Sequence, residues 1–493
     1  MATVIRSIGI SGITGYSIEV QAKVLGGLSI MNIVGLGDQA VKESKDRIES
    51  AFDQLGFIFP KKKIIINLSP SDTKKSGTYF DLPMVIALLI ESDQLKPANM
   101  NLGETIFLGE VGLGGELNHF KGVLPMVIEA QRKGYKRVIL PRESISEASR
   151  VGGIEIFGFA KISEVIKWME RRMIYSPPII KPCEKIIVHL PDFADVYGQD
   201  HIMKYVTAAA AGNHNLLLIG PPGCGKSMIA KRIPSILPDL TTEEALEVMT
   251  IQSVAGLLEN NGSLMRPFRA PHYNTSTNAI IGGGINAMPG EISFAHNGVL
   301  FLDELPEFSK PAIDSLRQPL EDRCVTVARV KQTNTFPANF MLVAAMNPCK
   351  CGHFGTGICK CSPGDVNRYR QRISGPVYDR LDIQKYLGVV NMFEEKKSNT
   401  KYTSKSMREE VLHARSIQYE RYKDINGLRT NSQIETKHIN VFCILDSQGQ
   451  DFMEEMYKKQ FISIAKSHGF NNSEIATHLN MTRRGVNEYC TMC

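Results

Sequence analysis

The sequence contains no apolar run long enough to cross a membrane, and its first residues lack the pattern of a signal peptide. These absences argue against a membrane or secreted protein and predict a cytoplasmic one. Disulfides are therefore not expected among the ten cysteines. Neither sign of charge is in large excess, since the net charge is +6 over 493 residues. This charge permits nucleic-acid binding without indicating it. A chain of this length predicts about three domains.

A glycine-rich stretch near the middle of the chain is its most specific motif. It lies between a short apolar run at 215–219 and a helical pattern at 228–233. It matches the phosphate-binding P-loop, G-x-x-x-x-G-K-S, and reads Gly220-Pro221-Pro222-Gly223-Cys224-Gly225-Lys226-Ser227. Backbone N–H groups of such a loop surround phosphate oxygens at the start of a helix. We expect Lys226 to reach the β and γ phosphates and the Ser227 hydroxyl to bind Mg²⁺.

Two adjacent carboxylates follow about eighty residues later. Asp303 and Glu304 come directly after the apolar run 299–302, which predicts a buried strand ending in an acid pair. In P-loop enzymes an aspartate at this place holds Mg²⁺, and a neighbouring acid orients the attacking water. We therefore predict hydrolysis of a nucleoside triphosphate, with Asp303 on the metal side and Glu304 as the catalytic base.

Four cysteines form two closely spaced C-x-C pairs, Cys349 with Cys351 and Cys359 with Cys361. Four thiolates are a common ligand set for tetrahedral Zn²⁺, although the usual pair is C-x-x-C. We predict a zinc site here, with four reduced cysteines in a glycine-rich loop as the alternative and His353 as a substitute ligand.

The first 170 residues are typical of a mixed α/β fold. Strand patterns occur at 17–24, 28–34, 64–68, 104–111 and 137–140, and helical patterns lie between them at 38–55, 81–91 and 123–133. No nucleotide motif occurs in this region; Gly35 and Gly37 are interpreted as a turn and a helix cap. Prolines and charges at 171–190 predict a linker.

The chain resembles the YifB/ComM family of magnesium chelatase-like AAA+ ATPases over residues 1–463. Its amino-terminal region carries two matching stretches, Ile33-Val34-Gly35-Leu36-Gly37-Asp38-Gln39-Ala40-Val41-Lys42-Glu43-Ser44 and Phe80-Asp81-Leu82-Pro83. The resemblance implies an α/β protein with a Lon-protease-like domain at 1–170, an AAA+ P-loop core at 191–385 and a helical lid at 386–465. Lon proteolysis needs a serine and a lysine, and the matching regions offer Ser76 before a glycine and Leu124 in place of the lysine. Proteolysis is therefore not expected.

The same resemblance implies further site residues. Asp195-Val196-Tyr197-Gly198-Gln199 would pack near the adenine of ATP, and the glycines at 282–284 would form the tip of a hairpin that points into a ring channel. Asn347, at the end of an apolar strand, would be the first sensor, with an ordinary strand-end asparagine as the alternative. Arg380 would be the arginine finger for a neighbouring subunit, and the alternative is an ion pair with Asp379 or Asp382.

The carboxyl end of the sequence departs from the family. The second-sensor arginine is replaced by Ser463-Ile464-Ala465-Lys466, and Lys466 is at best a weak substitute. Residues 466–493 have a helix-turn-helix pattern in which Arg483 and Arg484 open the second helix. The alternatives are a rearranged lid or a truncated chain end.

Taken together, the motifs predict an ATPase that uses ATP and Mg²⁺. The resemblance implies a homo-oligomeric ring, a hexamer, that acts on DNA as ComM-type branch-migration helicases do in DNA uptake and recombination. Two alternatives stay open. One is a chelatase-like motor with partner subunits. The other is a regulatory ATPase, which either remodels a protein partner or uses ATP only to control its assembly.

Overall fold

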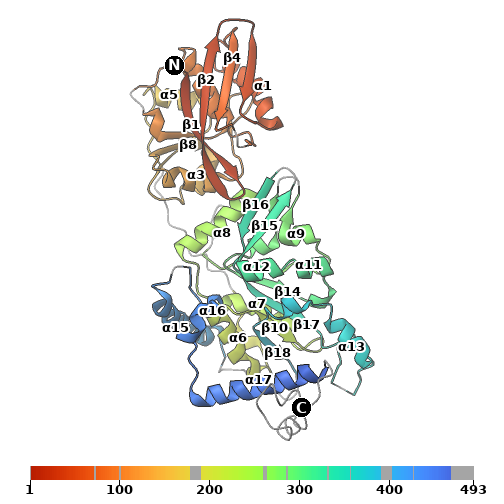
Figure 1. Ribbon diagram of the computed structural model, residues 1–493. Coiled ribbons are helices and arrows are strands. Elements are labelled where there is room, and N and C mark those ends of the chain that lie inside the picture. The colour runs from red at the N-terminus through yellow and green to blue at the C-terminus, as the bar shows by residue number, and fades with distance from the viewer. Residues whose placement is uncertain are drawn as a thin grey trace. The chain divides into compact units, whose positions relative to one another are not determined.

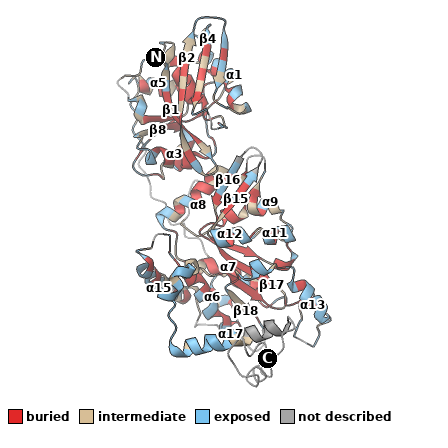
Figure 2. Cartoon of the chain, in the orientation of Figure 1, coloured by how far each residue is buried: buried red, intermediate tan, exposed pale blue. Residues whose placement is uncertain are grey.

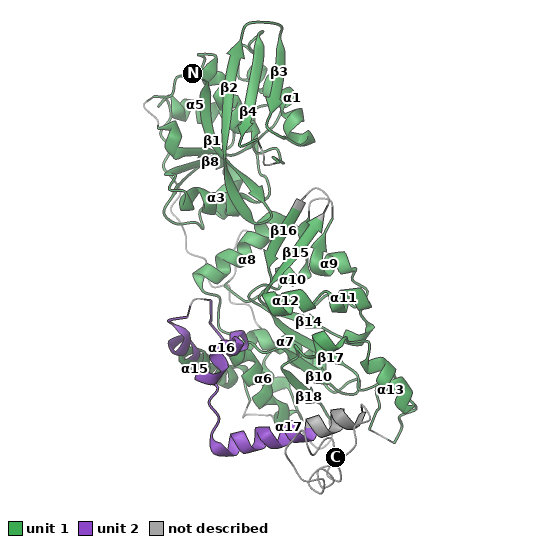
Figure 3. Cartoon of the chain, in the orientation of Figure 1, with its two compact units in different colours: residues 1–417 green, residues 418–493 purple. Residues whose placement is uncertain are grey.

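The computed structural model describes residues 2–71, 74–98, 101–177, 190–258, 264–284, 287–329, 332–355, 357–389, 402–425 and 427–467. It forms two compact units, residues 1–417 and 418–493 (Figure 3). Within the first unit we distinguish an amino-terminal part, residues 2–177, from a P-loop part, residues 190–389. Each is built around its own sheet (Figure 1).

The amino-terminal part contains a mixed seven-stranded sheet with the order β3-β4-β2-β1-β5-β8-β9. Its strands are β1 Thr3–Ser11, β2 Thr14–Leu25, β3 Ile30–Val34, β4 Lys63–Ser69, β5 Thr105–Phe107, β8 Arg137–Pro141 and β9 Glu155–Phe159. β1 pairs antiparallel with β2, and β2 antiparallel with β4, whereas the outer pairs are parallel. A small separate ladder joins β6 Glu110–Val111 to β7 Leu117–Asn118.

Helices of the amino-terminal part pack on this sheet. α1 Gln39–Gln54 begins where the Asp38 carboxylate accepts the Val41 N–H. α2 Asp81–Glu91 and α3 Val123–Arg132 lie against β1 and β2. Nearly every residue of α2 is buried, because the helix is apolar on all sides. Shorter helices complete this part: α4 Ile145–Ala148, α5 Ile162–Met169 and the 3-10 turns η1 Leu102–Glu104 and η2 Arg142–Ser144.

Most of the predicted elements of this region are present. α2 has the predicted bounds, and Gly35 adopts φ +108°, as a turn glycine does. The predicted strand 104–111 is wrong as a single element: it divides into β5 and β6, because the Gly109 N–H bonds to the Tyr79 carbonyl outside the ladder. β1 and β9 were not predicted.

The P-loop part contains a five-stranded parallel sheet with the order β11-β14-β17-β10-β18. Its strands are β10 Leu216–Ile219, β11 Phe268–Arg269, β14 Val299–Leu302, β17 Met341–Met346 and β18 Ile383–Tyr386. The three central strands, β14, β17 and β10, are buried along their whole length (Figure 2). Continuous apolar strands of this kind are typical of parallel sheets covered by helices on both faces.

The P-loop part also contains helices and two hairpins. The helices are α6 Asp200–Gly212, α7 Lys226–Ile236, α8 Thr242–Ala255, α9 Thr277–Ile281, α10 Glu291–Phe294, α11 Lys310–Asp314, α12 Arg317–Asp322, α13 Pro363–Arg370 and α14 Gly375–Tyr378, with 3-10 turns η3 Phe193–Asp195 and η4 Leu305–Glu307. The hairpins are β12 Gly282–Gly283 with β13 Met288–Pro289, and β15 Cys324–Arg329 with β16 Gln332–Pro337.

The first hairpin corrects the prediction for the three glycines. Gly282 and Gly283 form a strand, and only Gly284 lies in the turn; residues 285 and 286 fall outside the described residues. A Cβ on Gly282 would lie 2.4 Å from the Met288 carbonyl oxygen. The glycine is therefore required by the close approach of the two backbones.

α8 joins the two parts of the first unit. Its side chains Ala245, Val248 and Met249 are buried in the apolar core of the amino-terminal part. Near its end, the Ser253 carbonyl accepts the Gly122 N–H, and the Ser253 hydroxyl donates to Glu147 at 2.5 Å. α8 thus lies in the P-loop part of the sequence but packs in the core of the amino-terminal part.

The second unit is helical. The helix α15 Ser404–Tyr422 begins in the first unit, where Met407 and Val411 are buried. Within residues 418–467 follow η5 Asn431–Gln433, α16 Thr436–Phe442 and α17 Ser447–Ser467. The Tyr422 hydroxyl donates to Asn431 at 2.8 Å, and its ring packs edge-on against Phe442. The predicted tail motif, with Arg483 and Arg484, and most of the predicted linker lie outside the described residues, as does the Lys466 side chain.

Candidate nucleotide-binding site

The P-loop connects the central strand β10 to helix α7. Gly223 and Gly225 adopt φ values of +80° and +94°, a conformation that residues with a Cβ rarely adopt. Gly225 directly precedes the first helical residue, Lys226. The loop therefore has the strand, turn and helix order that presents backbone N–H groups and a helix N-terminus to a phosphate.

Lys226 lies at the centre of the predicted residues. Its Nζ donates to the carbonyls of Gly220 at 2.7 Å and Pro221 at 2.9 Å, and to Asn347 Oδ1 at 3.2 Å. The side chain is buried, and these three acceptors hold the ammonium against the loop that would receive a phosphate. The structure thus brings the P-loop lysine and the predicted first sensor into direct contact.

The acid pair also adjoins the P-loop. The Ser227 hydroxyl donates to Asp303 Oδ2 at 2.6 Å, which places the two predicted Mg²⁺ contacts side by side. Glu304 is exposed and adopts φ +53°, an unusual conformation for a residue that is not glycine. Backbone strain of this kind is frequent at functional sites. Serine and carboxylate oxygens are suitable ligands for Mg²⁺.

The segment predicted to lie near adenine is tied to the P-loop by one buried side chain. Gln199 Nε2 donates to the Cys224 carbonyl at 3.1 Å and to the Gly388 carbonyl at 3.0 Å. Its Oε1 is buried and has no hydrogen-bond partner among the described residues. The segment 195–199 therefore borders the P-loop, and its contact with adenine stays a prediction.

Arg380 lies away from the other predicted residues of its own chain. Its carbonyl accepts a bond from Asn215 Nδ2 at 2.8 Å, and Asn215 directly precedes β10. The P-loop follows the opposite end of that strand, which is about 13 Å long at 3.3 Å per residue. Its guanidinium pairs with Glu321 at 3.0 Å, and not with Asp379 or Asp382 as the alternative proposed. Asp382 instead accepts the Asn215 N–H.

The four cysteines converge on one point. All four Sγ atoms lie within 4.8 Å of one another, with separations of 3.4 Å for Cys349–Cys351, 3.7 Å for Cys351–Cys359 and 3.9 Å for Cys349–Cys359. Thiolates around a tetrahedral Zn²⁺ at 2.3 Å would be separated by about 3.8 Å. Backbone N–H groups of Lys360 and His353 point at Cys351 and lower the pKa of its thiol to about 6. The residues therefore fit a zinc ion.

This cysteine cluster, Cys349, Cys351, Cys359 and Cys361, adjoins the nucleotide site. Cys349 is buried two residues after Asn347. A Cβ on Gly352, which has φ +82°, would lie 2.8 Å from Pro222 Cδ, so the cluster loop packs directly on the P-loop. A folded cluster would therefore fix the position of both elements.

Two further side chains near the acid pair escaped the sequence analysis. Arg372 Nη1 donates to Glu307 at 2.8 Å and to the Pro306 carbonyl, just beyond Glu304. Tyr369 lies against the Asn347 backbone, and burial raises the pKa of its hydroxyl to about 12. Sequence analysis did not identify Arg372, because its partner Glu307 lies 65 positions away.

The fold and these contacts define a P-loop nucleotide-binding protein whose parallel sheet is consistent with an AAA+ core. Family comparisons agree: residues 192–395 match magnesium chelatase subunit ChlI, residues 20–144 match the ChlI subunit family, and residues 401–469 match the ChlI carboxyl-terminal family. The chain belongs to the magnesium chelatase-like AAA+ family that includes ComM and YifB, and this family implies ATPase activity.

Individual relatives cover most of the chain. It is 36% identical to the competence protein ComM of Haemophilus influenzae over 463 aligned residues. The alignment covers 93% of this chain and 89% of ComM. It is 38% identical to YifB of Escherichia coli over 454 aligned residues, and this alignment covers 90% of this chain and 86% of YifB. A shorter match, 43% identical over 51 residues, covers 10% of this chain and 8% of the Lon protease of Archaeoglobus fulgidus. No helix in the described part of the chain has the length and apolar character needed to span a bilayer.

Replacing Lys226 by methionine should weaken ATP binding about 10- to 100-fold, because hydrogen bonds to a charged group contribute about 1.5–3 kcal/mol each. Titration with a fluorescent ATP analogue measures the change. Lys231→Met, on the exposed side of the same helix α7, is the matched control and should bind ATP as the parent does. Equal affinities of the two variants would contradict the assignment of Lys226.

Proposed function

We propose that the protein is an ATP-driven AAA+ ring motor that acts on DNA, similar to ComM-type branch-migration helicases. The observation that carries the ATPase part is the meeting of Lys226, Ser227, Asp303 and Asn347 at one edge of the sheet. In this arrangement Lys226 would pair with the phosphates, Ser227 and Asp303 would hold Mg²⁺, whose charge would add to that of Lys226, Asn347 would hold the attacking water, and Glu304 would accept its proton. Hydrolysis then requires a stabilising charge for the γ-phosphate, which a second subunit supplies.

The location of Arg380 supports this assembly. It lies at the opposite end of β10 from the P-loop of its own chain, so it is suited to a neighbour's nucleotide. In the free subunit Glu321 holds the guanidinium by an ion pair between two partly exposed side chains. Exposed pairs of this kind are weak, so a phosphate can replace the carboxylate. A closed ring, a hexamer in this proposal, places each Arg380 at the next active site.

The DNA part rests on the relatives and on the two hairpins. ComM is named a competence protein, and the chain matches it over nearly its whole length. The hairpins β12–β13 and β15–β16 are joined by a bond from Asn334 Nδ2 to the Ala287 carbonyl at 3.1 Å. They are the elements that would face a ring channel and contact DNA. Residues 466–493, with their helix-turn-helix pattern, would add a second contact.

We also propose that the amino-terminal part has a Lon-like fold without protease activity. The stretches 33–44 and 80–83, which resemble the family's amino-terminal domain, support the fold. Leu124, at the place where the catalytic lysine would fall, is fully buried in α3, and Ser76 is exposed on a loop. A buried leucine cannot serve as a base, so this part would serve binding or assembly.

DNA should stimulate ATP hydrolysis by the assembled protein. The measurement compares ATPase rates with no addition, with single strands, with duplex and with a four-way junction. We expect the largest increase with the branched substrate and a fall at higher salt, because phosphate contacts release counterions. No stimulation by any nucleic acid would contradict a DNA motor and favour the chelatase-like or the regulatory alternative. Of these two, the family name, magnesium chelatase, suggests the chelatase-like one.

Catalysis should need residues from two subunits. Glu304→Gln should bind ATP and barely hydrolyse it, and Arg380→Ala should lose about 10³-fold in rate or more, as arginine fingers do. Mixing the two inactive variants should restore turnover at interfaces that combine an intact Glu304 with an intact Arg380. Parental hydrolysis by assembled Arg380→Ala protein would show that the finger is another residue.

The cysteine cluster should bind one Zn²⁺ per chain, which we propose as a structural clip between Asn347 and the P-loop. Metal analysis of protein purified without added zinc tests the stoichiometry. Replacing the four cysteines by serine should remove the metal and weaken ATP binding, because Gly352 would no longer hold Pro222 in place. A metal-free variant that binds ATP as tightly as the parent would contradict this role, and Cys443→Ser, at an exposed cysteine outside the cluster, is the control.

A further inference from the structure

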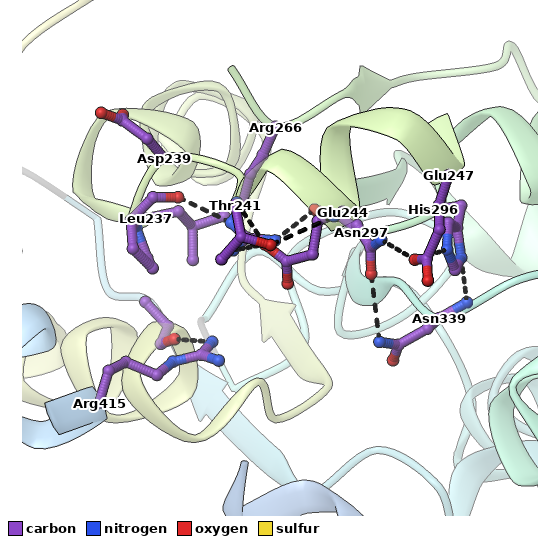
Figure 4. A network of polar contacts seen from close by, with 12 residues as sticks. Leu237, Asp239, Thr241, Glu244, Glu247, Arg266, His296, Asn297, Asn339 and Arg415 are labelled. Carbon is purple, nitrogen blue, oxygen red and sulfur yellow. Dashed lines mark hydrogen bonds and ion pairs between the residues drawn. The ribbon is translucent and has the colours of Figure 1, made fainter. Parts of the chain in front are cut away.

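Helix α8 carries a carboxylate, that of Glu247, which bonds to the loop before the central strand β14. Glu247 Oε2 accepts hydrogen bonds from His296 Nε2 at 3.0 Å and from Asn297 Nδ2 at 2.8 Å (Figure 4). Both bonds end on the same carboxylate oxygen. His296 is buried, although about half of the Glu247 side chain is exposed.

The imidazole of His296 connects Glu247 to a second loop, the one before β17. Its Nδ1 accepts the Asn339 N–H at 3.0 Å, so its proton lies on Nε2 and points at Glu247. Asn297 and Asn339 are also joined directly: the Asn297 N–H donates to the Asn339 carbonyl at 2.6 Å. Glu247 and His296 therefore hold two neighbouring loops in one arrangement.

These loops lead into the strands that carry the catalytic residues. Asn297 is two residues before β14, which ends just before Asp303 and Glu304. Asn339 is two residues before β17, which ends just before Asn347. The two strands pair in parallel, with Val299 opposite Met341. Paired strands of four to six residues are stiff, so a shift at their amino ends moves the carboxyl ends with them.

The helix that carries Glu247 is itself firmly held. Ala245, Val248 and Met249 are buried in the amino-terminal core. A second tie runs through Arg266, which donates to Glu244 at 2.9 Å and to the Asn297 carbonyl at 2.7 Å (Figure 4). Glu247 is thus a fixed reference point. Its partner Asn297 lies six residues before Asp303, which is about 20 Å of extended chain.

We infer that Glu247 and His296 are positioning residues for ATP hydrolysis. They set the placement of Asp303 and Glu304 on β14 relative to Asn347 on β17, without touching the nucleotide. The inference rests on the ATPase activity in the proposed function and is independent of DNA. Since the P-loop follows a different strand, β10, loss of the contact should affect the chemical step more than the binding of ATP.

The test compares Glu247→Ala with Glu247→Gln, measuring basal kcat without DNA and ATP affinity with a fluorescent analogue. Alanine removes both bonds and should lower kcat about tenfold, with Kd changed by less than about twofold, because displacements of about 1 Å far from the chemistry can cost a hundredfold. Glutamine offers one amide oxygen to the same two donors and should keep kcat within about twofold of the parent. Gln252→Ala, on the same helix but outside this network, is the control.

Parental kcat in a folded Glu247→Ala protein would overturn the inference, as would an equal loss of kcat in the Gln variant. The intact tie between Arg266 and Glu244 should keep the Ala variant folded, which its thermal melting temperature verifies. If the Ala variant does not fold, Glu247→Asp is tested in its place. Aspartate keeps the charge but shortens the reach by one methylene, so we expect the same loss of kcat. Absence of DNA stimulation would count against the DNA motor alone, because this comparison uses basal hydrolysis.

Discussion

The parallel pairing of β10, β17 and β14 is the constraint on which the candidate site depends. Ile219 lies opposite Met346, and Leu302 lies opposite Ala344. The residues that follow, the P-loop, Asn347 and the acid pair, therefore meet at the same edge of the sheet. A slip of one residue between β10 and β17 would turn the buried side chains of a strand to the wrong face and separate Lys226 from Asn347. Burial of all three strands fixes the register and so the site.

Residues that lie close together in the sequence were predictable from it. The P-loop, the strand before Asp303 and the helix predicted over 38–55 are local patterns, in which a few neighbouring side chains decide the structure. The cap of that helix is Asp38, however, and not Gly37 as predicted, because the Asp38 carboxylate accepts the Val41 N–H. The cysteine spacing likewise predicted a site in which the four thiols converge. Their roles in the protein stay predictions, but the structure places these side chains where such roles require them.

Contacts between distant residues could not be predicted. Nothing around Glu321 identifies Arg380 as its partner, and three short strands and two helices separate the helix of Glu247 from His296 in the sequence. The strand β1 escaped the sequence analysis because its alternation is broken by Gly9 and by buried Ser7, whose hydroxyl bonds to the Phe107 carbonyl. Such choices depend on which surfaces meet in the fold and not on any local pattern.

The packing of α8 determines where this chain can be divided. The proline-rich stretch at 171–190 suggests a natural cut, yet α8 follows it in the sequence and completes the core that precedes it. A fragment beginning at residue 190 would expose Ala245, Val248 and Met249 to water, and a fragment ending at 177 would leave the matching cavity open. The amino-terminal core is therefore complete only when α8 is part of the same chain.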